Sequence, residues 1–167
     1  FLTAIFGIPV PTYTIWFVIT FSVIVVKLFF SCRIAPRATC LKAVSNDDVI
    51  SQTACMFPDT QVNFSILEDT ESFNTVSLET IKRPHDLEDL DILILEGSFG
   101  VAENGAIWLN DVQMPMRVLP FITKHLVLVL KKDKIVTFMH QAYQKLASEY
   151  TEFGVFISGP SKTADIE

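Results

Sequence analysis

Two glutamates with the chemistry of a catalytic group frame a glycine-containing turn between two apolar runs. The stretch ILILEGSFGVAENGAIWL spans residues 92–109, and it places Glu96 at the end of the first run and Glu103 just before the second. A glutamate can attack an acyl group or move a proton, and glycines allow backbone N–H groups to approach an anion or an oxyanion. Glu96 and Glu103 are therefore the carboxylates of this stretch that could do such chemistry. The candidate ligand-binding residues of this stretch are Gly97, Gly100, Asn104 and Gly105.

The same residues also allow a purely structural interpretation. Asn104–Gly105 is the dipeptide typical of a tight β-hairpin turn, and Glu103 would then be a solvated residue beside that turn. Glu96 is the last residue of an apolar run that we expect to form a buried strand. We therefore expect it to pair with a backbone group or a lysine and not to act as a catalyst. The residue types alone leave both interpretations of Glu103 open.

A second candidate site lies at the end of the chain, in GPSKTADIE (159–167). Its turn residues and the acids that follow predict the start of a helix. That start could be a simple cap, or it could bind an anion through Gly159, Ser161, Lys162 and Thr163. A phosphate-binding Walker loop is excluded, because two residues separate Gly159 from the lysine that should follow it directly.

Composition excludes several classes of function. The formal net charge is −6, and no run of basic residues is longer than two, so a nucleic-acid partner is not expected. The three cysteines, Cys32, Cys40 and Cys55, form no C-x-x-C pair. Their spacing is that of neither a zinc site nor an iron–sulfur cluster. We therefore predict no metal and no cofactor.

The first 35 residues differ from the rest of the chain. Residues 1–26 carry no charge and are followed by a basic flank, as in a membrane anchor, but Pro9 and Pro11 interrupt the segment. A buried element and a segment foreign to the functional domain are the alternatives. We expect a helix over about residues 12–30 with few contacts beyond Gln61, and we divide the chain into residues 1–35 and a domain over 36–167.

The second part, 36–167, has the pattern of an α/β domain with a mostly parallel sheet and flanking helices. Residues 61–67 alternate as a half-buried strand does. Residues 91–97, 125–130 and 154–159 are continuous apolar runs, which indicate strands covered on both faces. Helical spacing between the last two predicts a crossover helix of about 15 residues, and so a parallel βαβ unit. Ligands of such sheets bind at the carboxyl ends of the strands, where both candidate sites fall.

Three motifs in this order resemble the lactate-utilisation protein C family, whose domain is called LUD: LEGSFGVAENGAIWL, LPFITKHLVLVL and FISGPSKTADIE. The resemblance covers residues 89–167 clearly and begins near Gln61. It implies a fold similar to the sugar-phosphate isomerase and coenzyme A transferase superfamily. Relatives continue beyond the position of Glu167, so the resemblance also implies an incomplete carboxyl edge here.

The resemblance implies a role in oxidising L-lactate to pyruvate beside iron–sulfur partner proteins, as an accessory subunit in the cytoplasm. A membrane tether would apply only if residues 1–26 form an anchor. AENG also resembles the Ser-Glu-Asn-Gly stretch of coenzyme A transferase β chains, whose glutamate attacks an acyl thioester, with Ala102 in place of the serine. This resemblance implies that Glu103 is the catalytic residue, as a nucleophile or an acid/base group. The alternative is thus a small-molecule enzyme of the transferase or isomerase type that uses Glu103 on a small anionic ligand.

Overall fold

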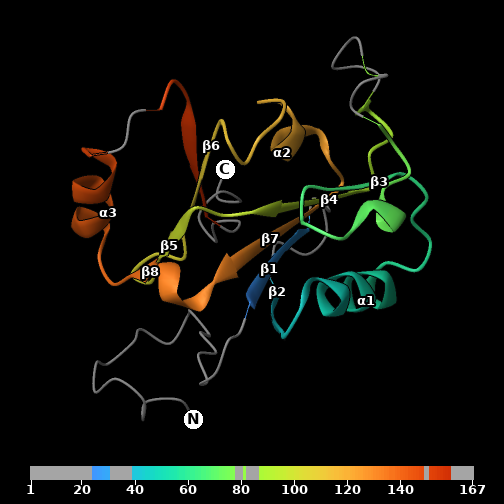
Figure 1. Cartoon of the computed structure of the whole chain (residues 1–167), viewed down its shortest axis with the longest axis horizontal. Helices are drawn as coiled ribbons and strands as arrows, with labels where there is room; N and C mark the ends of the chain where they lie inside the picture. Colours follow the sequence, from blue (N-terminus) through green and yellow to red (C-terminus); the bar gives the residue numbers. More distant parts are fainter. Residues whose placement is uncertain (1–23, 31–38, 78–80, 82–86, 149–150, 159–167) are drawn as a thin grey trace, which may run out of the picture.

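The computed structural model describes residues 24–30, 39–77, 81, 87–148 and 151–158. Figure 1 shows these residues as two packed sheets with helices around them. The strands are β1 (Ile24–Phe30), β2 (Thr39–Ala43), β3 (Asn63–Ser65), β4 (Ile92–Glu96), β5 (Phe99–Val101), β6 (Ile107–Asn110), β7 (His125–Lys131), β8 (Ile135–Val136) and β9 (Gly154–Ile157). The helices are α1 (Asn46–Met56), α2 (Leu119–Ile122), α3 (Met139–Leu146) and the 3-10 turns η1 (Glu71–Phe73) and η4 (Lys132–Lys134).

Sheet A has five strands in the order β2-β1-β7-β4-β3. Strands β3, β4 and β7 run parallel to one another, whereas β1 runs antiparallel to both β7 and β2. The α/β class predicted from the sequence is confirmed. The parallel arrangement holds for the half of the sheet that contains β4 and β7.

Sheet B has four strands in the order β8-β5-β6-β9. Here β9 pairs antiparallel with β6, so the prediction that residues 154–158 join residues 125–130 in one parallel sheet is wrong. An apolar run shows that a strand is buried, but it does not specify which strand lies beside it. The final strand thus finds its partner in β6 of the second sheet.

The crossover helix expected after β7 is also shorter than predicted. Residues 132–134 form η4, residues 135–136 form strand β8 beside β5, and the helix itself comprises only Met139–Leu146. Ile135 and Val136 are β-branched, and such side chains fit a strand better than a helix. Ile135, Val136 and Met139 have helical spacing in the sequence, but only Met139 belongs to the helix.

Alternating residues of the central strands face two separate hydrophobic cores. Leu93 and Leu95 of β4 lie in the core between sheet A and sheet B, whereas Ile92 and Ile94 face the core under α1. The reverse face of sheet B carries Phe99, Trp108 and Phe156, which pack against α3. The layers are therefore α1, sheet A, sheet B and α3, and Figure 1 shows α1 and α3 at opposite sides of the molecule.

Residues 24–30 belong to sheet A. Strand β1 pairs with β7 along its whole length, from Ile24 opposite Lys131 to Phe30 opposite His125. The helix predicted to run through Phe30 is therefore wrong over 24–30, where the β-branched residues form a strand. Residues 1–23, which contain the rest of that prediction, lie outside the described residues. Among the residues that the structure describes, no helix is long and apolar enough to cross a bilayer.

Candidate functional site

The AENG stretch is the turn of a hairpin between β5 and β6, which pair antiparallel. Within the turn, the Gly105 N–H donates to Val101 O at 2.9 Å, and the Val101 N–H donates to Ala106 O at 2.8 Å. Gly105 has φ 71°, a conformation that suits glycine and strains other residues. The hairpin that the Asn–Gly pair predicts is thus present.

The carboxylate of Glu103 meets the start of α3. Its Oε2 accepts a hydrogen bond from the Met139 N–H at 2.8 Å, and its own N–H donates to Thr137 O at 3.1 Å. The Gln141 side chain also binds this segment, since its Oε1 accepts hydrogen bonds from the N–H groups of Thr137 and Phe138 at 3.0 and 3.1 Å. Because the first N–H groups of a helix have no partner within it, Glu103 and Gln141 together cap α3.

Asn104 joins the turn to β9. Its Oδ1 accepts from the Ala106 N–H at 3.0 Å, and its backbone carbonyl accepts from Ser158 Oγ at 2.9 Å. Its Nδ2 lies 3.8 Å from the sulfur of Met139. Ser158 thus places the end of β9 beside the turn. The candidate ligands that follow it, Gly159, Ser161, Lys162 and Thr163, lie outside the described residues.

Gly97 and Gly100 occupy close-packed positions. A Cβ atom at Gly97 would overlap with Cγ2 of Ile107, and one at Gly100 would overlap with Cδ2 of Leu130. The Gly97 N–H donates to Val129 O at 2.8 Å, so it is already used within the fold. These glycines let sheet B approach β7, and ligand binding through them stays a prediction.

Glu96 pairs with lysines, as predicted. Its Oε1 lies 2.9 Å from Lys131 Nζ and 3.7 Å from Lys134 Nζ, at the carboxyl edge of β4 and β7. The hydrogen bond and the negative charge of Glu96 raise the pKa of Lys131. The cluster is half exposed, and the carboxylate offsets the lysine charge that an anionic ligand would need.

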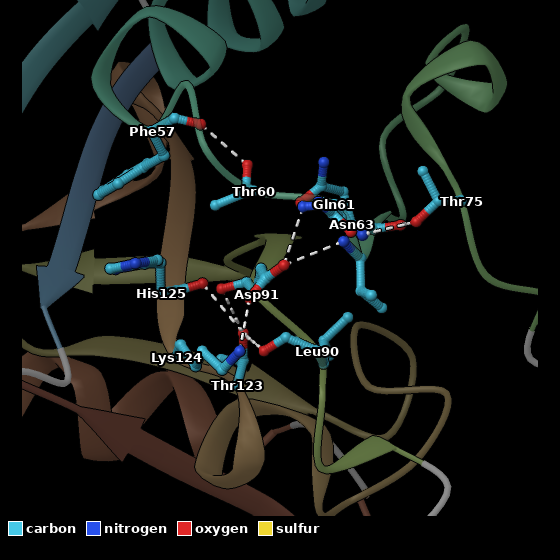
Figure 2. Close-up of polar contacts among 11 residues, drawn as sticks. Phe57, Thr60, Gln61, Asn63, Thr75, Leu90, Asp91, Thr123, Lys124 and His125 are labelled. Carbon is cyan, nitrogen blue, oxygen red and sulfur yellow. Dashed lines mark hydrogen bonds and ion pairs between the residues drawn. The ribbon is translucent and has the colours of Figure 1, made fainter.

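The opposite, amino edge of the same strands holds a polar cluster that was not predicted from the sequence (Figure 2). Asp91 Oδ1 lies 2.7 Å from Lys124 Nζ, and Oδ2 accepts the N–H groups of Gln61 and Val62 at 2.9 and 3.0 Å. Burial alone would raise the pKa of Asp91, but the hydrogen bonds from Lys124, Gln61 and Val62 outweigh it and hold the pKa at about 2. The carboxylate is therefore charged at every physiological pH.

His125 and Thr123 extend this cluster. The His125 ring stacks on Phe57 at the end of α1, with centroids 4.1 Å apart. Burial lowers the pKa of His125, the negative charge of Asp91 acts in the opposite direction, and Lys124 lowers it further. The Thr123 hydroxyl lies 3.5, 3.4 and 3.1 Å from the backbone carbonyl oxygens of Leu90, Asp91 and His125. Its side chain lies beside these carbonyls in Figure 2.

A signal for the cluster was present in the sequence. Asp91 and Lys124 each stand immediately before the first residue of a strand, and the parallel register pairs Ile92 with His125. Opposite charges one residue before two neighbouring parallel strands must lie side by side. The cluster joins β3, β4, β7 and the end of α1, and its ionised carboxylate and protonated lysine suit it to holding strands together.

No group of three or more histidine, cysteine or acidic side chains is placed to hold a metal ion within the part of the chain that the structure describes. A shallow depression is lined by Asn110, Asp111, Val112, Thr151 and Glu152, away from the residues predicted from the sequence. The candidate site is the hairpin turn with the start of α3 and the end of β9, which Glu103 and Asn104 join to the turn.

Comparison with known proteins identifies the family. No curated protein and no solved structure matches the chain at a significant level. The family model of the LUD domain matches residues 55–167, well over half of the chain. The matched range includes the hairpin, the Asp91 cluster and both candidate sites, while β1 and β2 precede it. The chain therefore belongs to the LUD-domain family, which is named for the domain of the lactate-utilisation proteins.

Proposed function

We propose that this protein is an accessory subunit for L-lactate utilisation, which works beside iron–sulfur proteins in the oxidation of L-lactate to pyruvate. The observation that carries the proposal is the LUD-domain match over residues 55–167. The proposal places the protein in the cytoplasm with those partners. Electron transfer falls to the partners, because the dispersed cysteines of this chain do not follow the spacing of cluster ligands.

The contacts of the hairpin turn favour an accessory role. The candidate nucleophile Glu103 is engaged by the Met139 N–H, and the N–H groups of Gly97 and Gly105 donate to backbone carbonyls. An oxyanion site needs N–H donors directed at the reacting atom. These glycine donors are instead directed at partners inside the fold.

An acyl-transferring enzyme that uses Glu103 is the second candidate. One observation favours it: the Glu103 side chain is exposed and lies beside Asn104 in the turn. In such an enzyme the Glu103 carboxylate would attack a thioester carbonyl and release the thiolate, which forms an acyl-glutamyl anhydride. The two candidates differ in what the isolated chain can do.

Affinity co-purification separates them. The full chain would carry a tag and be expressed together with the iron–sulfur lactate-utilisation proteins of the same organism. An accessory subunit elutes with these partners and with their iron, and the Glu103→Gln variant does the same, because Gln retains a hydrogen-bond acceptor for Met139. A chain that elutes alone would refute the proposal. If that chain also traps an acyl group from acetyl-coenzyme A at Glu103, the second candidate is supported.

A further inference from the structure

The only Asn–Gly pair in the sequence is Asn104–Gly105, at the tip of the hairpin. In this dipeptide the backbone nitrogen of the glycine can attack the carboxamide carbon of the asparagine, since no side chain hinders it. The attack forms a C–N bond that closes a succinimide ring, and the side-chain nitrogen leaves as ammonia. Water then opens the ring to aspartate or isoaspartate.

The structure holds both reacting groups of this pair in hydrogen bonds. The nucleophilic nitrogen belongs to Gly105, which is buried and donates to Val101 O at 2.9 Å. The carboxamide is fixed by the Ala106 N–H, which donates to Asn104 Oδ1 at 3.0 Å. Ser158 Oγ secures the peptide between them by donating to Asn104 O at 2.9 Å. Asn104 itself is exposed, so water and base reach it.

We propose that Asn104–Gly105 is a latent modification site, which forms a succinimide only when the hairpin turn opens. The Gly105 N–H must leave Val101 O before its nitrogen can approach the Asn104 side chain. Local opening of a surface turn costs less free energy than global unfolding, so the native chain reacts through this minor state. The rate of deamidation therefore reports how firmly the turn is held.

The products would alter the candidate functional site. Aspartate at position 104 loses the Nδ2 donor near Met139 and places a second carboxylate beside Glu103. Isoaspartate adds an atom to the backbone of a turn whose hydrogen bonds fix the register of β5 and β6. Both products weaken the junction between the hairpin, α3 and β9.

The test compares deamidation at position 104 in the native full chain and in the chain unfolded by urea, by peptide mapping and an isoaspartate assay. We expect the native rate to be slower by at least about tenfold, the ratio for an opening that costs about 1.4 kcal/mol. Ser158→Ala removes one restraint, and we expect it to raise the native rate roughly fivefold, as for one lost hydrogen bond, without changing the rate in urea.

Ser51→Ala is the matched control. Ser51 Oγ also donates to a backbone carbonyl, that of Asp47 at 2.8 Å, but it lies in α1 on the far side of sheet A. This variant should leave the rate at position 104 unchanged. Equal rates in the native and unfolded chains would overturn the proposal, and so would a Ser158→Ala rate identical to that of the Ser51→Ala control.

Discussion

The Glu103 carboxylate accepts a hydrogen bond from the backbone N–H of Met139 at 2.8 Å. This contact joins two segments that are 36 positions apart in the sequence, the hairpin turn of sheet B and the first residue of α3. The residue that most resembles a catalyst in the sequence thus has a structural task. Whether that task explains its presence can be tested by substitution.

Replacing Glu103 with alanine should destabilise the protein by about 1 kcal/mol, the usual cost of losing a helix cap. Glu103→Gln retains an oxygen acceptor and should cost less than half as much. Urea unfolding of both variants measures the difference. Equal losses for the two variants would show that the charge, and not the cap, provides the stabilisation.

Asp91→Asn should lower the free energy of unfolding by about 2 kcal/mol at neutral pH. The folded-state pKa of Asp91 is about 2, below the ordinary value of 3.8, so its contribution is present above pH 4 and is lost as the pH falls towards 2. The gap between wild type and variant should close over that window. Lys124→Ala should cost less, because the N–H groups of Gln61 and Val62 still bind the carboxylate. A gap of the same size at all pH values would contradict this account.

His125 should make the protein less stable in mild acid. Its pKa is lowered by burial, so the unfolded state binds the proton more tightly, and stability is lost as the pH falls below the ordinary value of 6.5. His125→Phe keeps a ring against Phe57 and should reduce the difference in unfolding free energy between about pH 7.5 and about pH 5.5. His140→Phe is the control, since His140 also stacks on a phenylalanine, Phe138. Equal effects of the two substitutions would exclude His125 as the source.

Gly154→Ala should be more damaging than Gly100→Ala. The new methyl group at position 154 would overlap with the rigid ring of Trp108, whereas at position 100 it meets the flexible end of Leu130. Overpacking of this kind costs about 1–3 kcal/mol, and we expect Gly154→Ala at the upper end. Thermal and urea unfolding of both variants checks the order, and the reverse order would show that Trp108 moves more easily than Leu130.

The purified protein should contain neither iron nor zinc in stoichiometric amount. The three cysteines lack the spacing of cluster or zinc ligands, so the isolated chain would need ligands from distant segments. Elemental analysis of the chain purified alone is the measurement. One iron or zinc per chain would refute the prediction.

The sequence predicted which segments are buried better than it predicted their neighbours. Continuous apolar runs located β4 and β7 because helices or a second sheet cover both faces of these strands. The partner of β9 could not be predicted, since antiparallel pairing with β6 depends on contacts distant in sequence. The short strand β8 was not predicted, because its two residues also fit the helical spacing of the residues that follow them.

The candidate site was predicted in part. The Asn–Gly pair located the hairpin, because only a few dipeptides suit its turn. The cap that Glu103 provides could not be predicted, since it requires knowing that α3 begins beside the turn. The Asp91–Lys124 pair was predictable once β4 and β7 were recognised as neighbours, because both residues stand at the same position before their strands.

We propose that this LUD-domain protein supports L-lactate oxidation without using Glu103 as a nucleophile. The most direct measurement is the rate of L-lactate-dependent reduction of an electron-acceptor dye by the iron–sulfur lactate-utilisation proteins of the same organism. The rate is compared without this chain, with it, and with its Glu103→Gln variant. We expect the chain to raise the rate, and the variant to raise it to nearly the same extent. No effect of the chain, or an effect that Glu103→Gln abolishes while the variant remains folded, would contradict it.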